Sequence, residues 1–244
     1  MRHVLLPPTL SAEPPSVGGK IHDFFGQTMG TVWAVRAVFD GQLTEAALQS
    51  GVEQQLANIV AEMSHWLPSS NLMQFNQSSA DCWQVLPAAF FEVLSFALEV
   101  ARESDGAYDP TAGALVNLWG FGANGRYDQA NFIAPTAEQV RNTLNKQGWQ
   151  QLRIDREQQR AYQPGGIHID LSAVAKGYAV DRVSNYLSSQ NISHHLVEVG
   201  GELRGAGIKP DGTPWWVALE HPPITMHHAN EELNECIILS LIHI

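Results

Sequence analysis

The stretch HIDLSAVAKGYA at residues 168–179 decides how the middle of this chain is organised. Its pattern predicts a strand that ends at Asp170, then a helix capped by Ser172 with Lys176 one turn further on. Such a turn brings together unpaired backbone N–H groups, the positive end of a helix dipole and a lysine cation. These groups suit a phosphate or pyrophosphate. An ordinary capped helix with a solvated Lys176 is the other reading of the same spacing.

The composition is that of a globular protein with an acidic balance. The chain has 244 residues, a formal net charge of −11 and 44% hydrophobic residues, enough for one large domain or two small ones. The acidic excess argues against nucleic acid and anionic membranes as partners. No stretch is long enough for a transmembrane segment, and the apolar run Val4–Leu6 is too short for a signal peptide, so we expect a cytoplasmic protein.

Periodicity along the chain predicts a mixture of helices and short strands. The predicted helices are 43–66, 87–103, 136–148 and 172–190, and the predicted strands are 27–39, 151–154, 161–163, 166–170, 196–199, 202–205 and 215–220. This order favours an α+β fold with a cleft between two subdomains. We expect a flexible Pro-rich arm at 1–19, one domain at 20–222 and an atypical tail at 223–244. The apolar run from Ile237 to Ile244 within that tail reads as an unpaired edge strand.

Further motifs stand in order around residues 168–179. They are Met29-Gly30-Thr31; Met63-Ser64-His65-Trp66 with Ser69, Ser70, Phe75 and Asn76; Ser104–Thr111 with Leu118–Gly122; and Val197–Glu202 with Gly205. This ordered set resembles the FAD:protein FMN transferases, the ApbE-type flavin transferases. The resemblance implies an α+β fold of mixed helices and mainly antiparallel sheets, forming two subdomains with the cofactor cleft between them.

The resemblance also implies a set of cofactor-binding residues, while catalytic residues stay unassigned. The implied FAD contacts are Met29, Trp66, Ala107, Tyr108, Asp109, Asp170 and Lys176, and the backbone oxygen of Ala173 is the implied Mg²⁺ ligand. Stacking of Trp66 or a lining role for Met29 is physically sensible against a planar flavin. Core packing is the alternative for Trp66 and Tyr108, and a helix cap is the alternative for Asp109.

The implied function is a Mg²⁺-dependent transfer of FMN from FAD onto a Thr or Ser of an acceptor protein, which releases AMP. One alternative is an FAD pyrophosphatase that gives FMN and AMP. Another is an FAD-binding protein that lacks transferase activity because the C-terminal half of the metal site is missing, and a third is a remnant that does not fold stably. The family continues with a Thr-rich Gly segment, a His-bearing loop and an Ala-Asp…Thr pair that are absent here, so we expect the domain at 20–222 to be incomplete. Many members are periplasmic or attached to the cell envelope, which is the alternative location.

Overall fold

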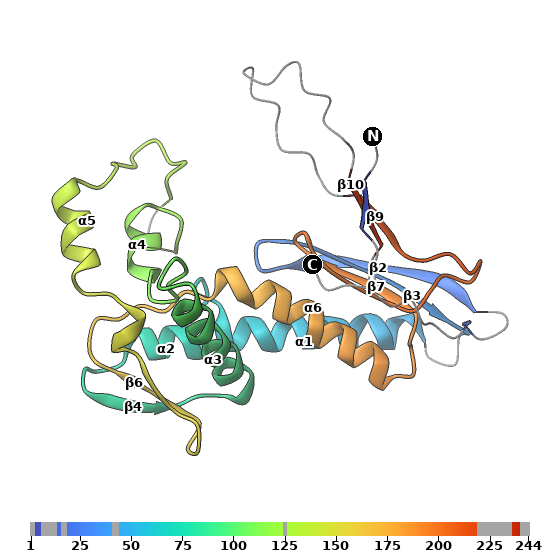
Figure 1. Cartoon of the computed structure of the whole chain (residues 1–244), viewed down its shortest axis with the longest axis horizontal. Coiled ribbons are helices and arrows are strands. Elements are labelled where there is room, and N and C mark those ends of the chain that lie inside the picture. The colour runs from blue at the N-terminus through green and yellow to red at the C-terminus, as the bar shows by residue number, and fades with distance from the viewer. Residues whose placement is uncertain are drawn as a thin grey trace. The chain divides into compact units, whose positions relative to one another are not determined.

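A computed structural model describes residues 3–5, 14–15, 19–40, 44–123, 126–218 and 236–239 of the chain. The helices are α1 Glu45–Met63, α2 Asn71–Gln77, α3 Ala88–Glu103, α4 Gly113–Leu118, α5 Ala137–Leu144 and α6 Ser172–Ser189, with a 3-10 turn η1 at Trp149–Gln151. The strands are β1 His3–Leu5, β2 Lys20–Thr28, β3 Thr31–Phe39, β4 Cys82–Val85, β5 Arg153–Asp155, β6 Arg160–Gln163, β7 His195–Val199, β8 Glu202–Ala206, β9 Trp216–Ala218 and β10 Cys236–Leu239. Figure 1 shows this mixture of helices and sheets, which confirms the predicted α+β class.

The chain folds into two compact units. One unit combines Met1–Gln55 with Ala179–Ile244, and the other is the continuous segment Leu56–Tyr178. The predicted division into two subdomains is therefore confirmed, and a cofactor cleft between them stays a prediction. None of the helices within the described residues is long and apolar enough to cross a membrane.

The first unit is built on a four-stranded sheet in the order β2-β3-β7-β8, with every neighbouring pair antiparallel. The β2–β3 hairpin closes through Met29 and Gly30, both with positive φ (49° and 72°), the signs that a tight two-residue hairpin turn requires. Trp33 lies across Gly26 of the neighbouring strand, where a Cβ would come within 2.4 Å of the indole. The large aromatic thus replaces the side chain that the glycine lacks.

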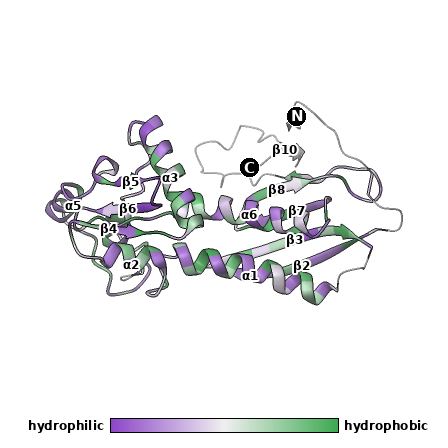
Figure 2. Cartoon of the chain, turned by 90° about the horizontal axis from the view of Figure 1, so that it is seen from below, coloured by the Kyte–Doolittle hydropathy of each residue, from purple (hydrophilic) through white to green (hydrophobic). Residues whose placement is uncertain are grey.

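Apolar side chains of α1, α6 and the sheet form the core of this unit. Its buried members include Val35, Leu48, Val52, Val183, Leu187 and Val197. Figure 2 shows hydrophobic and hydrophilic bands alternating along α1, as expected for a helix with one buried face. Tyr186 of α6 packs over Gly51 of α1, where a Cβ would overlap the phenol oxygen. The glycine therefore permits the close approach of the two helices.

A second sheet of the same unit has the order β1-β10-β9. β10 pairs in parallel with β1 and antiparallel with β9. The prediction of an unpaired edge strand is wrong for Ile237–Leu239, because β10 has a partner strand on each side. His3–Leu5 is a strand inside the predicted arm. Residues 223–235 and 240–244, and most of 1–18, lie outside the described residues, so the arm and the tail stay predictions there.

The second unit carries the sheet β4-β6-β5, which is antiparallel throughout, and α3. Phe90, Val93, Leu94 and Ala97 form the buried face of α3. Pro87 precedes the first turn of this helix, and Asp105 and Gly106 end it in the positive-φ region (51° and 80°), as the sequence predicts.

Candidate functional site

The segment that leads into α6 is held by side chains instead of a sheet. Asn76 of α2 donates from Nδ2 to the carbonyl of Ile169 (3.0 Å) and accepts from the Ile169 N–H at Oδ1 (2.7 Å). Gln163 binds the carbonyl and N–H of Ile167 in the same way (3.0 and 3.3 Å). The prediction of a strand at 166–170 is wrong, since β-type pairing there is limited to an isolated bridge between Ala112 and His168. Two buried amides take the hydrogen bonds that a sheet would have supplied.

The turn at residues 110–113 supports this segment from another side. The Asp170 N–H donates to the carbonyl of Pro110 (2.8 Å), and the Gly113 N–H donates to the carbonyl of His168 (3.0 Å). A Cβ at Gly113 would lie 2.7 Å from the His168 carbonyl oxygen. Glycine is therefore required where α4 begins, because any side chain would push the two segments apart.

Asp170 caps the N-terminus of α6. Its Oδ1 accepts from the Ser172 N–H at 2.8 Å, and the carbonyl of Leu171 accepts from the N–H groups of Val174 (3.0 Å) and Ala175 (2.8 Å). Leu171 thus occupies the N-cap position predicted for Ser172, and the preceding carboxylate supplies the capping oxygen. A carboxylate at this end also interacts favourably with the helix dipole.

His65 and Trp66 follow the end of α1 in a turn fixed by two serines. The Ser64 hydroxyl oxygen accepts from the N–H groups of Trp66 (3.1 Å) and Leu67 (3.2 Å). Ser70 donates to the Ser64 carbonyl (2.6 Å) and caps α2 by accepting from the N–H of Met73. The motif Ser64-His65-Trp66 is therefore a rigid turn that places an imidazole beside an indole, with 5.4 Å between the ring centroids.

His65 reaches the start of α6. Its Nδ1 lies 3.3 Å from the Ser172 hydroxyl and 3.9 Å from Oδ2 of Asp170. The His65 and Asp170 side chains are 20% and 11% exposed. Nε2 of His65 is buried and has no hydrogen-bond partner among the described residues.

Tyr108 places a buried hydroxyl near two carboxylates. Its Oη has no hydrogen-bond partner in the described part of the chain. Burial, followed by the negative charges of Asp170 and Asp109, raises the pKa of Tyr108 to about 12. The phenol therefore stays protonated at neutral pH and can donate one hydrogen bond to a bound acceptor.

Asp109 braces its own loop. Oδ1 accepts from the N–H (2.8 Å) and the hydroxyl (2.7 Å) of Thr111, and Oδ2 accepts from the Trp149 N–H (3.3 Å). Thr111 in turn accepts from the N–H of Gly148 at 3.0 Å. Both oxygens of Asp109 therefore tie residues 109–111 to η1. The alternative of a helix cap is wrong for α4, because Ala112 is its N-cap and no side chain caps it.

The structure places Asp109 and Asp170 near enough to Tyr108 for both charges to raise the pKa of its hydroxyl. Ala107 and Ala173 are exposed, Lys176 is half-buried on α6, and the Trp66 side chain is 49% exposed. Met29 belongs to the other unit, in the β2–β3 turn. His65 and Ser172 also belong to the cluster; the motif around Trp66 contains His65, but sequence reasoning assigned it no role.

The donor chemistry at the start of α6 suits part of a magnesium site. Within the described ranges, no three His, Cys, Asp or Glu side chains gather at one point. The available donors at and before the predicted ligand Ala173 are its carbonyl, the Ser172 hydroxyl and the Asp170 carboxylate. Mg²⁺ takes such oxygens and usually keeps water or substrate phosphate as its other ligands. These residues fit the ion only together with a ligand's phosphate oxygens.

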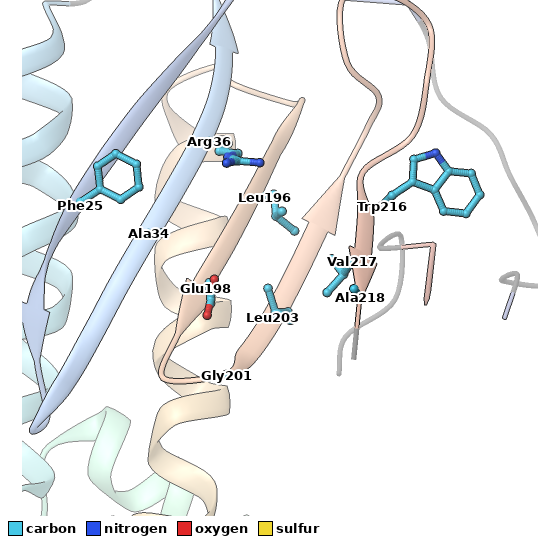
Figure 3. A pocket seen from close by; sticks show the side chains of 10 residues that line it. All are labelled: Phe25, Ala34, Arg36, Leu196, Glu198, Gly201, Leu203, Trp216, Val217 and Ala218. Carbon is cyan, nitrogen blue, oxygen red and sulfur yellow. The ribbon is translucent and has the colours of Figure 1, made fainter. Parts of the chain in front are cut away.

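A separate cavity of about 540 Å³ lies on the first unit. Figure 3 shows its lining residues, which come from the sheet β2-β3-β7-β8 with the turn at Gly201, and from β9 of the second sheet. Phe25 and Trp216 are exposed at this cavity, and Arg36 and Glu198 contribute charges. None of the residues implied to bind FAD lines it, so we locate the candidate site by the hydrogen-bonded cluster at α6.

A profile of the ApbE family matches residues 29–241, which is most of the chain. The chain belongs to the ApbE family. This membership confirms the resemblance seen in the ordered motifs, with the cluster at α6 inside the matched region.

Relatives in the ApbE family carry a consistent name. A protein of Haemophilus influenzae named FAD:protein FMN transferase is 33% identical over 218 residues, covering 87% of this chain and 62% of the relative. A protein of the same name from Salmonella typhimurium is 36% identical over 200 residues, covering 81% of this chain and 56% of the relative. The chain thus spans about 60% of the length of the curated relatives it matches.

Solved structures of the ApbE family share the fold. The flavin transferase ApbE from Vibrio cholerae superposes with a TM-score of 0.78 at 32% identity, covering 84% of this chain and 65% of that one. The ApbE protein of Thermotoga maritima gives a TM-score of 0.74 at 25% identity, covering 91% and 68%.

Proposed function

We propose that this chain binds FAD and acts as a Mg²⁺-dependent FAD:protein FMN transferase, moving FMN onto a Thr or Ser of an acceptor protein and releasing AMP. The observation that carries the proposal is the cluster at the start of α6. Asp170 caps the helix there, and its charge acts on the Tyr108 hydroxyl, which has no hydrogen-bond partner in the part of the chain that the structure describes. The names of the relatives support the same reaction.

The reaction is a phosphoryl-type transfer. The acceptor oxygen forms a bond to the phosphorus on the FMN side, the bond from that phosphorus to the bridging oxygen breaks, and AMP leaves. The acceptor hydroxyl loses its proton to solvent in this scheme. Charge develops on the phosphate oxygens, so the protein's contribution is to hold the pyrophosphate and to offset that charge.

Each residue of the cluster has a defined task in this proposal. The α6 N-terminus and Lys176 offset negative charge on the phosphates. Tyr108, which is protonated at neutral pH, donates to an acceptor atom of FAD, while Asp170 accepts from a donor of the ligand or holds the ion. Ala173 would hold Mg²⁺ through its carbonyl, and the ion would neutralise phosphate charge. Met29 and Trp66 would contact the flavin, and the Ala107 backbone would add polar contacts.

The experiment separates binding, hydrolysis and transfer. FAD is titrated against the chain by flavin fluorescence with and without Mg²⁺, and AMP release is then followed by chromatography. One arm contains only water, and the other contains a pool of peptides with Thr and Ser. We expect Mg²⁺-strengthened binding and peptides whose mass has increased by one FMN.

Three outcomes have different meanings. AMP and free FMN in the water arm, without labelled peptide, would assign a pyrophosphatase. Binding with no AMP would assign an FAD-binding protein without transfer. Absence of FAD binding by a chain that unfolds cooperatively would contradict the proposed function.

A further inference from the structure

The contacts of Ser172 and His65 determine where two protons lie. The Ser172 N–H is used by Oδ1 of Asp170 (2.8 Å), and the Ser172 hydroxyl lies 3.3 Å from Nδ1 of His65. The same Nδ1 faces Oδ2 of Asp170 at 3.9 Å. That distance is too long for a hydrogen bond and short enough for a strong electrostatic preference.

The carboxylate decides which imidazole nitrogen carries the proton. An ionised carboxylate only accepts hydrogen bonds, so a lone pair on Nδ1 would face negative charge, whereas an N–H would be attracted to it. Nε2 is buried without a partner in the described part of the chain, and a buried N–H without an acceptor is costly. Both considerations place a proton on Nδ1.

The Ser172 hydroxyl must then accept from His65. Because its oxygen receives the Nδ1 proton, the hydroxyl's own proton points away from the imidazole. Ser172 is exposed in the first turn of α6, at the positive end of the helix dipole. A hydroxyl donor is thus added to a helix end that already favours anions.

We infer that Ser172 is a binding residue that donates its hydroxyl proton to a phosphoryl oxygen of the ligand, and that His65 is the positioning residue that turns the hydroxyl outward. This inference rests on the proposed FAD site and adds two residues to it. The ligand group is a phosphate diester or pyrophosphate oxygen, since a hydroxyl donor at the positive end of a helix dipole favours a negatively charged acceptor.

The first test measures the tautomer without any ligand. The chain is labelled with ¹⁵N-histidine, and the imidazole nitrogens of its 10 histidines are recorded by NMR. The His65 signals are identified as those missing from His65→Asn. We expect a proton on Nδ1 of His65. A His65 ring protonated only at Nε2 would overturn the inference.

The second test uses two variants of His65. One places an amide N–H near the position of Nδ1, and the other places it near the position of Nε2. The side-chain amide in His65→Asn places its N–H near the former Nδ1, whereas the longer amide in His65→Gln extends to the former Nε2 position. We expect Ser172→Ala, His65→Leu and His65→Gln each to weaken binding of FAD and of inorganic pyrophosphate about tenfold, the effect of losing one hydrogen bond to a charged group. His65→Asn should stay near the parent affinity.

Controls distinguish positioning from general damage. Ser189→Ala, in the last turn of α6, removes a hydroxyl that donates to the Tyr186 carbonyl and should leave both affinities unchanged. The double variant His65→Leu/Ser172→Ala should bind as weakly as either single variant, since both remove the same donor. All variants are compared by thermal unfolding, so that loss of fold is recognised.

The remaining outcomes of the binding measurements separate the Ser172 role, the His65 role and the proposed function. A parent that binds FAD, with Ser172→Ala binding equally well, overturns the inference and leaves the proposed function intact. His65→Asn as weak as His65→Leu overturns the positioning role. A parent that binds neither FAD nor pyrophosphate overturns the proposed function and the Ser172 role together, whatever the tautomer of His65.

Discussion

A substitution at Asp170 can remove the negative charge and keep the oxygen that caps α6. The Oδ1 atom of Asn in Asp170→Asn can still accept from the Ser172 N–H, so we expect α6 and the free energy of unfolding to change little. The negative charge is lost, and FAD binding should weaken about tenfold. Lys176→Ala should weaken binding by a similar factor through loss of a cation. Fluorescence titration checks both, with Asp128→Asn on the exposed Arg126 pair as control.

Parent-like FAD affinity in both variants would contradict the assignment of these residues to the site. A large drop in unfolding temperature for Asp170→Asn would show instead that the carboxylate charge is needed for the fold.

Tyr108 gives a prediction about stability at alkaline pH. Its folded-state pKa of about 12 lies above the unfolded value of 10, so the unfolded chain loses this proton first as the pH rises. The parent should lose roughly 1–2 kcal/mol of stability between pH 10 and 12 on this account, after allowance for solvent screening. Tyr108→Phe should lack that loss. It should also keep parent stability at pH 7, since the Oη has no hydrogen bond to lose within the described ranges.

The measurement is denaturant unfolding of both proteins from pH 8 to 11.5. Parallel stability curves would show that Tyr108 is not the group responsible. A strong loss of stability in Tyr108→Phe at pH 7 would reveal a hydrogen bond to the phenol.

At single residues, the sequence predicted where Asp170 lies, but it did not predict which side chains Asp170 and Ser172 contact. The spacing of residues 168–179 correctly placed Asp170 next to a helix N-terminus. It assigned the cap to Ser172, because a serine before an apolar run is the usual signal, whereas the carboxylate two residues earlier provides it. His65 lies more than a hundred residues from Ser172 in the chain, and no local pattern could have paired them.

Among the elements, the contact between α4 and the segment before α6 depends on a single glycine. A methyl group at Gly113 would meet the His168 carbonyl at 2.7 Å, so Gly113→Ala must break the hydrogen bond between these residues or move one of the segments. We expect a loss of roughly 1–3 kcal/mol in unfolding free energy. Gly212→Ala serves as the comparison. A Cβ at Gly212 meets nothing within 4 Å, so this variant pays only for the positive φ of its surface turn.

Urea unfolding compares the two glycine variants. A Gly113→Ala protein as stable as the parent would show that the contact with the His168 carbonyl costs nothing.

The contact between α6 and β7 predicts a stability loss in mild acid. His195 is buried, with its Nε2 2.7 Å from the Ser184 hydroxyl and its Nδ1 donating to the Ile192 carbonyl (3.0 Å). Burial lowers the pKa of His195 to about 4, below the unfolded value of 6.5. The contribution is therefore present above pH 6.5 and is lost as the pH falls towards 4, by roughly 3 kcal/mol.

His195→Asn keeps a donor near Nδ1 and removes the titration. We expect its unfolding free energy to depend less on pH between 6.5 and 4 than that of the parent. An unchanged pH dependence would show that His195 is not responsible for it.

The longer helices were predictable and the short helices were not, whereas the predicted short strands overlap β5, β6, β7, β8 and β9. Helices α1, α3 and α6 and the capping box of Thr136 and Gln139 appear as expected. The short helices α2 and α4 were missed, since one or two turns give too little periodicity. The predicted strand 27–39 is wrong at Met29 and Gly30, where a turn separates β2 from β3. β2 was missed except at its end, because Ile21, Phe24 and Phe25 put apolar residues on both faces and hide the alternation. α5 ends at Leu144, four residues before the predicted end at Gly148.

For the whole molecule, the chain order of the two units predicts the order of folding. The second unit is one continuous segment, whereas the sheet of the first pairs Trp33 with Val199. Closing the loop between Trp33 and Val199 costs conformational entropy before the hydrogen bonds and contacts of the paired strands can form. We expect amides of α3 to be protected before those of β3 and β7 in a pulsed hydrogen-exchange experiment. Simultaneous protection would contradict this order.

The pairing of β3 with β7 also has a consequence for biosynthesis. Roughly 150 residues separate the two strands, and at 5–20 residues per second a ribosome needs roughly 10–30 s to make them. During that time the β2–β3 hairpin has left the ribosome, but β3 still lacks its neighbouring strand β7. Trp33 and Val35 of β3 are almost fully buried in the finished protein. The nascent chain therefore presents an apolar strand edge for most of its own synthesis, a natural target for chaperones that bind emerging chains.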